Sequence, residues 1–318
     1  MHRPPRSGSV GVYTSLAELL ALQYPARSFS LLGKQPSGSP LAGRRGTRLR
    51  GRGLSFEELR GYQPGDDVSS IDWKVTARTQ KPHVRVYTEE RERPVLLVVD
   101  QRLAMFFGTQ QQMKSTTAAE LATVIAWQVL AAGDRVGALV FDDADYSSIA
   151  PHRSRRTVGR LLDSLIEYNG RLTVDGGLKH SSSQLNQVLE HVVSRAMHDW
   201  IVVLISDFQG MNADTQRLIR RIGRRNDVIA ALVHDVTAVN LPAHQRFIIS
   251  DTQLQAEIDM TDATVRTAIQ AIHQQRLAYL DHLSAALAIP FLSINTGGDV
   301  VGQLRHALGF QPAAGRKN

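Results

Sequence analysis

From Pro94 onward, hydrophobic blocks of strand length alternate with amphipathic segments of helix length. The blocks are nearly continuous, which is typical of strands that are covered on both faces. They lie at residues 95–99, 136–141, 201–205, 228–233 and 289–294. Helices are predicted between and after them at 115–131, 154–167, 183–197, 212–222, 263–287 and 299–308. This alternation predicts an α/β fold with a mainly parallel sheet flanked by helices.

The N-terminal part of the chain has a different, irregular pattern. Ser15 and Glu18 have the spacing of a capping box and precede several leucines, which predicts a short helix. Residues 33–53 are rich in Gly, Pro, Ser and Arg and are predicted to form a flexible loop. Residues 56–62 are interpreted as a helical turn, and 83–87 as a strand. The predicted division of the chain is an N-terminal helix and flexible segment at 1–44, a small irregular region at 45–93, the α/β domain at 94–310 and a tail at 311–318.

Residues 50–78 combine turn formers, aromatic side chains and both signs of charge. Such a mixture is typical of an ordered, functional surface loop. Asp66 and Asp67 follow a Pro-Gly turn that can present carboxylates rigidly, and Trp73 is expected to be a buried anchor. The charged residues either pin this loop to the α/β domain or form a docking surface for a partner.

Aspartates end the predicted strands of the sheet. The carboxyl ends of parallel strands gather at one edge, where open α/β sheets place their sites. Asp100 and Asp207 follow two of these blocks and are candidates for one shared site, although a single Asp in such a place often only caps a helix. The other strand ends carry Asp142, Asp143 and Asp235.

The composition limits the classes of function. The 318 residues include no cysteine, so disulfides and thiolate metal sites are excluded. No apolar run approaches the ~18 residues of a membrane span and no signal peptide is evident, so the protein is expected to be cytoplasmic. The net charge of +7 is concentrated in arginine groups near 44–52, 153–160 and 217–225. These groups leave nucleic-acid binding open as an alternative, but stacking aromatics are not interleaved with them, so specific nucleic-acid binding is not expected.

Catalytic signatures do not emerge from the sequence. It contains no phosphate-binding loop of the G-x-x-x-x-G-K-[ST] type, no H-E-x-x-H and no G-x-S-x-G. His180, His191 and His198 lack the i, i+4 spacing of a helical metal pair. The chain is therefore predicted not to be an enzyme.

The sequence resembles the bacterial "domain of unknown function 58" family. The resemblance rests on Arg60–Tyr62, Pro64–Asp67, Ile71–Lys74 and Ala77–Arg78, followed by VLLVVD, GDRVGALVFDD and WIVVLISDF. These last three segments are similar to strands of a von Willebrand factor A-like domain. The resemblance implies a von Willebrand A-like (Rossmann-like) fold and a metal-ion-dependent adhesion site.

That adhesion site is expected to be degenerate. Its first Asp corresponds to Asp100 and its last to Asp207, while its Thr falls near Ser183. Its two serines correspond to Arg102 and Ala104, so two of the five protein ligands are lost and a fixed positive charge is added. Mg²⁺ binding is therefore disfavoured, and any metal set of Asp100, Ser183 and Asp207 is weak or lost. We expect the Arg102 guanidinium to take the place of the ion and to pair with both aspartates.

The resemblance also implies a role in protein–protein interaction. Members of this family commonly sit beside MoxR-type AAA+ ATPases, which suggests an adaptor or co-chaperone that works with such an ATPase and with an unknown client. The expected partner-binding residues are Asp100, Arg102, Ser183, Asp207, Asp66 and Asp67. The alternatives are a nucleic-acid-binding protein and a Mg²⁺-dependent hydrolase built on the two strand-end aspartates.

Overall fold

The structure is a computed structural model. It describes residues 11–28, 53–90, 93–109, 111–173, 181, 183–196, 198–235, 246–250, 255–259, several positions between 262 and 290, and 291–310. Contacts divide the chain into two compact units, Arg45–Glu92 and the remainder. Residues 33–52 of the predicted flexible loop, the tail at 311–318 and most of the predicted helix at 263–287 lie outside the described residues.

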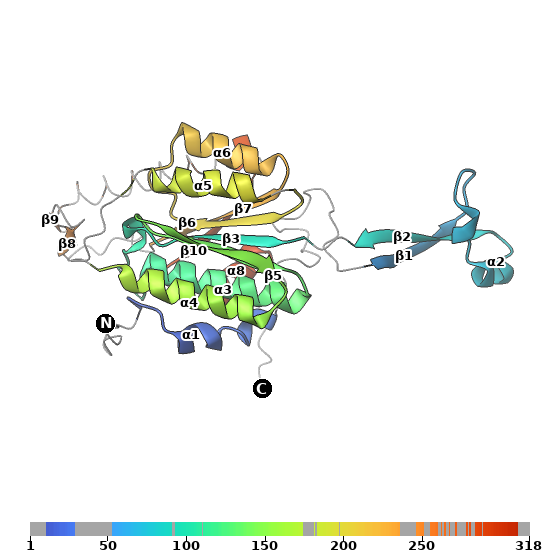
Figure 1. The fold of residues 1–318 in the computed structure, drawn as a ribbon, viewed down its shortest axis with the longest axis horizontal. Helices are drawn as coiled ribbons and strands as arrows, with labels where there is room; N and C mark the ends of the chain where they lie inside the picture. Colours follow the sequence, from blue (N-terminus) through green and yellow to red (C-terminus); the bar gives the residue numbers. More distant parts are fainter. Residues whose placement is uncertain are drawn as a thin grey trace. The chain divides into compact units, whose positions relative to one another are not determined.

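A six-stranded sheet forms the centre of the larger unit, in the order β10-β7-β6-β3-β4-β5 (Figure 1). Its neighbours pair in parallel except β4 and β5, which are antiparallel. If the strands are renumbered within this sheet, the order is 3-2-1-4-5-6, that of a doubly wound fold. The predicted fold class is therefore confirmed. The strands are β3 (Val95–Asp100), β4 (Val136–Phe141), β5 (Tyr146–His152), β6 (Ile201–Ser206), β7 (Asp227–His234) and β10 (Phe291–Asn295).

Edge strand β5 was not predicted. Only Ile149 is buried among its seven residues, so it lacks the continuous apolar run of its neighbours. Its pairing with β4 shifts register between Val136 and Ala138. Gly137 lies at this irregularity, where an added Cβ would come within 2.6 Å of the Ile149 carbonyl oxygen. Glycine at this position allows the backbone of β5 to approach β4 closely.

Helices cover both faces of the sheet (Figure 1). Helices α3, α4 and α8 lie on one face, and α5 and α6 lie on the other. Helix α3 is buried along most of its length because it also contacts the N-terminal segment, as well as α4 and α8. A separate two-stranded sheet pairs β8 (Arg246–Ser250) with β9 (Gln255–Asp259). The helices are α3 (Lys114–Ala132), α4 (Arg155–Arg171), α5 (Gln184–Arg195), α6 (Ala213–Gly223) and α8 (Val300–Ala307).

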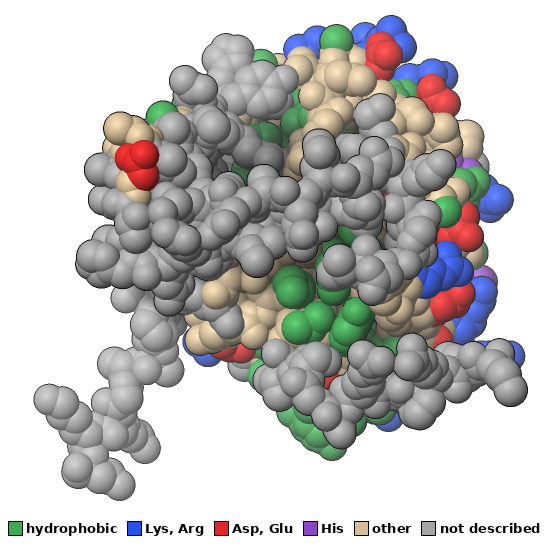
Figure 2. Space-filling model, turned by 90° about the vertical axis from the view of Figure 1, so that its left-hand side faces the viewer, with side chains coloured by type: hydrophobic (Ala, Val, Ile, Leu, Met, Phe, Trp, Pro, Cys, Tyr) green, Lys and Arg blue, Asp and Glu red, His purple; other side chains and the backbone are tan. Residues whose placement is uncertain are grey.

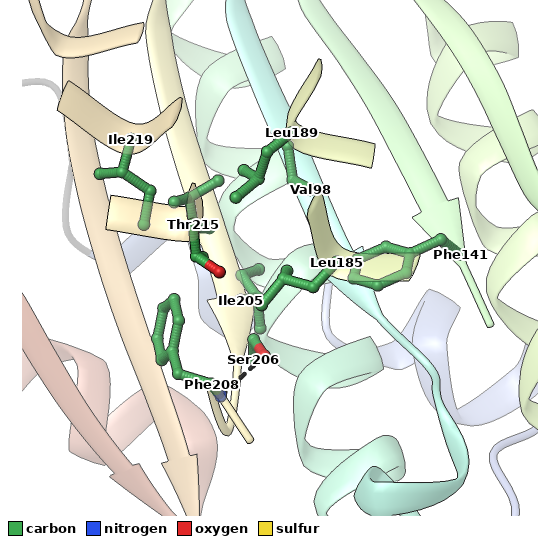
Figure 3. Close-up of a pocket in the computed structure, with 10 residues that line it drawn as sticks. Val98, Phe141, Leu185, Leu189, Ile205, Ser206, Phe208, Thr215 and Ile219 are labelled. Atoms are coloured by element: carbon green, nitrogen blue, oxygen red, sulfur yellow. Dashed lines mark hydrogen bonds between the residues drawn. The ribbon is translucent and has the colours of Figure 1, made fainter. Parts of the chain in front are cut away.

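The core between the sheet and helices α5 and α6 is closely packed. Leu189, Val98 and Phe208 are among its buried side chains. It contains a cavity of about 10 Å³ (Figure 3), far below the volume of a small-molecule pocket. The side chains drawn in Figure 3 are apolar except for Ser206 and Thr215. This face of the sheet is therefore structural.

The N-terminal segment belongs to the larger unit. Helix α1 (Leu16–Ala21) begins at Ser15 with the predicted capping box. The backbone N–H of Thr14 donates to Asn169 Oδ1 at 3.0 Å, and the Tyr13 hydroxyl donates to the Leu172 carbonyl at 2.7 Å. These contacts attach residues 11–28 to helix α4 and its C-terminal end.

The smaller unit is built on an antiparallel pair, β1 (Gly53–Gly61) with β2 (His83–Glu90). Most of the 56–62 segment therefore belongs to a strand, and the predicted helical turn is wrong. Pairing with β2 determines its conformation, which no local pattern indicated. Between the strands lie a 3₁₀ turn (Val68–Ser70) and helix α2 (Trp73–Thr79).

Candidate functional site

The carboxyl end of β3 holds a buried ion pair between Asp100 and Arg102. Arg102 Nη2 donates to Asp100 Oδ2 at 2.7 Å, and Arg102 Nε lies 3.0 Å from Oδ1. The backbone N–H of Arg102 also donates to Oδ1 at 2.9 Å. Both side chains are 0% exposed. Arg102 thus forms the expected pair with Asp100.

The end of β6 adjoins the same carboxylate. Ser206 Oγ donates to Asp100 Oδ2 at 2.6 Å, and Arg102 Nη2 donates to the Gln209 carbonyl at 3.1 Å. The loop that follows β6 turns sharply, with positive φ at Phe208 (54°) and Gly210 (80°). For a bulky residue such as Phe208, this conformation is uncommon and is maintained by its surroundings. The two strand ends therefore meet at one edge of the sheet.

Asp207 forms an ion pair with Lys114, a partner that the sequence did not predict, and its charge also acts on Arg102. Its Oδ2 accepts a 2.6 Å hydrogen bond from Lys114 Nζ, at the first residue of α3. Lys114 is 11% exposed in its side chain and Asp207 is 4% exposed. Sequence reasoning missed Lys114, because a single lysine at the start of a helix carries no recognisable motif. Arg102 and Lys114 therefore each neutralise one carboxylate.

The surroundings keep Arg102 charged. Burial by itself lowers the pKa of a guanidinium, but the charge of Asp100 and its hydrogen bonds, together with Asp207 and Asp143, raise the pKa of Arg102 above its usual value. Its guanidinium carbon lies 5.8 Å from the centre of the Phe141 ring. Its Nη1 is buried and makes no hydrogen bond with the residues that the structure describes. The site thus retains one unused donor.

These residues do not fit a magnesium ion. Ser183, the expected third ligand, is exposed, and its hydroxyl contacts Ser181 and Gln187. Asp143, another acidic residue at this edge, accepts backbone N–H groups from Leu103 at 2.6 Å and Ser181 at 2.8 Å. No group of three or more His, Asp or Glu within the described part of the chain is arranged to hold a metal ion. A cation would have to displace the two basic side chains that already bind the strand-end carboxylates.

The aspartate at the end of β7 has a structural role. The Thr109 hydroxyl donates to Asp235 Oδ1 at 2.5 Å, and the Thr296 hydroxyl donates to Oδ2 at 2.8 Å. Asp235 is 5% exposed. These bonds attach the loop after β3 to the ends of β7 and β10.

Three aspartates of the smaller unit, Asp66, Asp67 and Asp72, are held by contacts within that unit. Asp66 forms a bidentate pair with Arg60 at 2.7 and 2.8 Å. Asp72 caps helix α2 and accepts from Arg85 Nε at 2.9 Å. The hydrogen bonds from Arg60 and Arg85 lower the pKa of Asp66 and Asp72 respectively, while the Ser69 backbone N–H lowers that of Asp67. These contacts make the loop rigid within its own unit.

Trp73 is not the buried anchor that the sequence suggested. It is 65% exposed at the first residue of α2. Val68, at the start of the preceding 3₁₀ turn, is 57% exposed. The polar residues of the loop thus determine its shape, while two of its large apolar side chains face solvent. An ordered loop that exposes a tryptophan has the composition of a protein interaction site.

The basic clusters provide weaker evidence for a site. Residues 44–52 lie outside the described part of the chain. On α6, Arg217 pairs with Asp214 at 3.0 Å. Side chains of both charges are interspersed along the top of the face shown in Figure 2, the side on which α6 lies in Figure 1. The described part of this helix resembles a solvated surface rather than a continuous basic stripe.

The strand order, the antiparallel edge strand and the two helical layers define an α/β protein of the von Willebrand A-like class. The chain belongs to the family described as Protein of unknown function DUF58, whose model matches residues 58–278. Relatives in Mycobacterium tuberculosis and Mycobacterium bovis are 30% identical over 227 residues, which is 71% of this chain and 69% of each relative.

Two solved structures have weak likenesses to this fold. The conserved hypothetical protein BatB of Bacteroides thetaiotaomicron is 10% identical, with a TM-score of 0.39 over 68% of this chain and 95% of BatB. A von Willebrand factor type A protein of Catenulispora acidiphila is 14% identical, with a TM-score of 0.28 over 60% of this chain and 43% of that one. Among the residues that the structure describes, no helix has both the length and the apolar character to cross a membrane.

Proposed function

We propose that this protein is a non-catalytic protein–protein interaction module, an adaptor or co-chaperone that works with a MoxR-type AAA+ ATPase. The observation that carries the proposal is Trp73, which is 65% exposed on a loop held rigid by ion pairs. Family membership and fold class agree with such a role but do not specify the partner. The ATPase would hydrolyse ATP, and this chain would supply the recognition surface.

The loop is well suited to binding without a large loss of entropy. Asp72 receives two backbone N–H groups of α2 and the Arg85 side chain, which fixes the helix start where Trp73 lies. Asp66 fixes the preceding turn through Arg60 and the Gln63 backbone N–H. A preorganised tryptophan loses little conformational freedom on binding, so more of its burial contributes to affinity.

The edge of the sheet supplies a second surface for the proposed function, one that does not depend on metal. Arg102 and Lys114 already compensate the carboxylates of Asp100 and Asp207. In this proposal, a partner would not bind through a carboxylate that ligates a metal ion at this edge. Recognition there would use shape and the hydrogen-bonding groups of the loop after β6.

The proposal is tested by affinity purification of the full chain from a cell extract of its source, with and without ATP, followed by mass spectrometry. We expect recovery of a MoxR-type ATPase in a nucleotide-dependent manner, and we expect Trp73→Ala to reduce it at least about tenfold. Tyr24→Ala is the matched control, because Tyr24 is an aromatic residue that is 77% exposed in the other unit. Equal recovery with both variants would rule out the Trp73 surface, and no ATPase in either nucleotide state would rule out the proposed partner.

A further inference from the structure

The C-terminal end of α3 and the start of α4 enclose a basic cleft that the proposed function does not use. Its volume is about 300 Å³, at the lower end of the range for small-molecule sites. Each charged side chain that lines it is an arginine: Arg27, Arg153 and Arg155. None of the three forms an ion pair among the residues that the structure describes. Three uncompensated positive charges in one cleft favour an anionic ligand.

The backbone positions part of this basic lining. Gly133 ends α3 with a φ of +86°, and an added Cβ there would lie 3.0 Å from Arg153 Nη2. The absence of a side chain at Gly133 therefore leaves room for the Arg153 guanidinium. Helix α4 has 17 residues and begins beside Arg153, with Ser154 capping the N–H of Thr157. The backbone N–H groups of Arg155 and Arg156 have no acceptor within the helix, as is general for a first turn.

A largely buried tryptophan forms part of the wall of the cleft. Trp127 lines the cleft and is only 7% exposed. Its indole Nε1 makes no hydrogen bond with any described residue. An indole N–H can only donate, and a buried donor without a partner is rare and costly. The cleft thus combines three arginine side chains with the free amides of a helix start, against a wall formed in part by Trp127.

We propose that this cleft binds a phosphate-bearing anion, either a free polyphosphate-type ligand or the headgroup of an anionic phospholipid. Guanidinium groups bind phosphate oxygens in a bidentate manner, and helix N-termini favour anions. A single carboxylate would leave two of the three arginines uncompensated. A diphosphate carries enough charge and enough acceptor oxygens to satisfy all three. The inference does not depend on the proposed partner, because it uses neither Trp73 nor the edge of the sheet.

The test is calorimetric titration of the full chain with inorganic pyrophosphate at low salt, beside sedimentation with phosphatidylglycerol and with phosphatidylcholine vesicles. Arg153→Gln/Arg155→Gln should weaken binding at least about tenfold, as expected for the loss of charge-assisted hydrogen bonds. Arg220→Gln/Arg221→Gln on α6 removes the same charge from exposed positions outside the cleft and should change affinity less than about twofold.

The two binding measurements distinguish a soluble phosphate ligand from a lipid headgroup. Saturable pyrophosphate binding that is lost in the cleft variant assigns a soluble phosphate ligand, and binding only to phosphatidylglycerol vesicles assigns a lipid headgroup. Circular dichroism of both variants verifies that they are folded. Absence of both interactions, or equal weakening by the α6 control, would overturn the proposal.

Discussion

Removal of the Arg102 side chain tests the energetic role of the buried ion pair. Arg102→Met retains an apolar stem but leaves the Asp100 carboxylate buried without its cation. Breaking such a pair by removing one partner costs about 3–5 kcal/mol. Asp100 would retain the Ser206 hydroxyl and the backbone N–H of residue 102, at 2.6 and 2.9 Å. We therefore expect the lower end of this range, about 3 kcal/mol of unfolding free energy.

The measurement is urea denaturation followed by circular dichroism, with the m-value compared between variants. A loss of about 3 kcal/mol corresponds to a decrease in Tm of about 6–12 °C for a domain of this size. Arg217→Met is the control, because its pair with Asp214 is exposed, with side chains 75% and 58% accessible. That change should cost less than about 0.5 kcal/mol.

A second substitution separates the charge from the packing. Asp100→Asn/Arg102→Met removes both charges, so it should be more stable than Arg102→Met alone by about 1–2 kcal/mol. If Arg102→Met loses less than about 1 kcal/mol, or if the second substitution adds a further loss, then uncompensated burial of Asp100 is not the dominant effect and the reasoning fails.

Three further predictions follow from the same structure. Calorimetric titration of the wild-type chain with Mg²⁺ should give no saturable heat, because Arg102 replaces an oxygen ligand; a sub-millimolar affinity would contradict this. The hydrogen bonds from Arg60 lower the pKa of Asp66 in the folded state. Ionised Asp66 therefore stabilises the fold at pH values above its pKa in the unfolded chain, and this stabilisation is lost as the pH falls through its pKa in the folded protein. Arg60→Gln should move the NMR titration of Asp66 to higher pH, and an unchanged titration would refute the assigned cause. Gly137→Ala should lower the unfolding free energy by about 1–3 kcal/mol in denaturant melts, because its Cβ would meet the backbone of β5; a neutral effect would show that β5 can move away.

The sheet could be predicted from sequence because its inner strands are apolar along their whole length. Strands such as β3 and β6 show this as continuous runs, and parallel pairing then brings Asp100 and Ser206 to one edge. Strand β5 was not predicted because an edge strand with one buried residue has no continuous apolar run. Strand β1 was not predicted because its pairing with a segment some thirty residues away determines its conformation.

The candidate site was predictable only in part for a related reason. Arg102 lies two residues from Asp100, so local chemistry already indicates an ion pair. Lys114 reaches Asp207 across 93 residues, and no pattern in one sequence encodes that distance. Trp73 was misjudged because its type suggests burial, whereas its position at the start of α2 exposes it. In each case the missing information concerns tertiary contacts.

The way in which the strand-end aspartates are satisfied limits how this edge can bind a partner. Arg102 compensates Asp100, Lys114 compensates Asp207, and threonine hydroxyls donate to Asp235. An edge whose carboxylates are already hydrogen-bonded within the protein offers little attraction for a divalent ion, so the affinity of a partner should not depend on one. In the affinity experiment, the complex should first be formed with nucleotide and then washed with or without a chelator. Partner recovery should be the same after both washes. If the chelator releases an intact ATPase from this chain, a metal ion lies at the interface. That result would contradict the assignment of Arg102 and Lys114 as replacements for the ion.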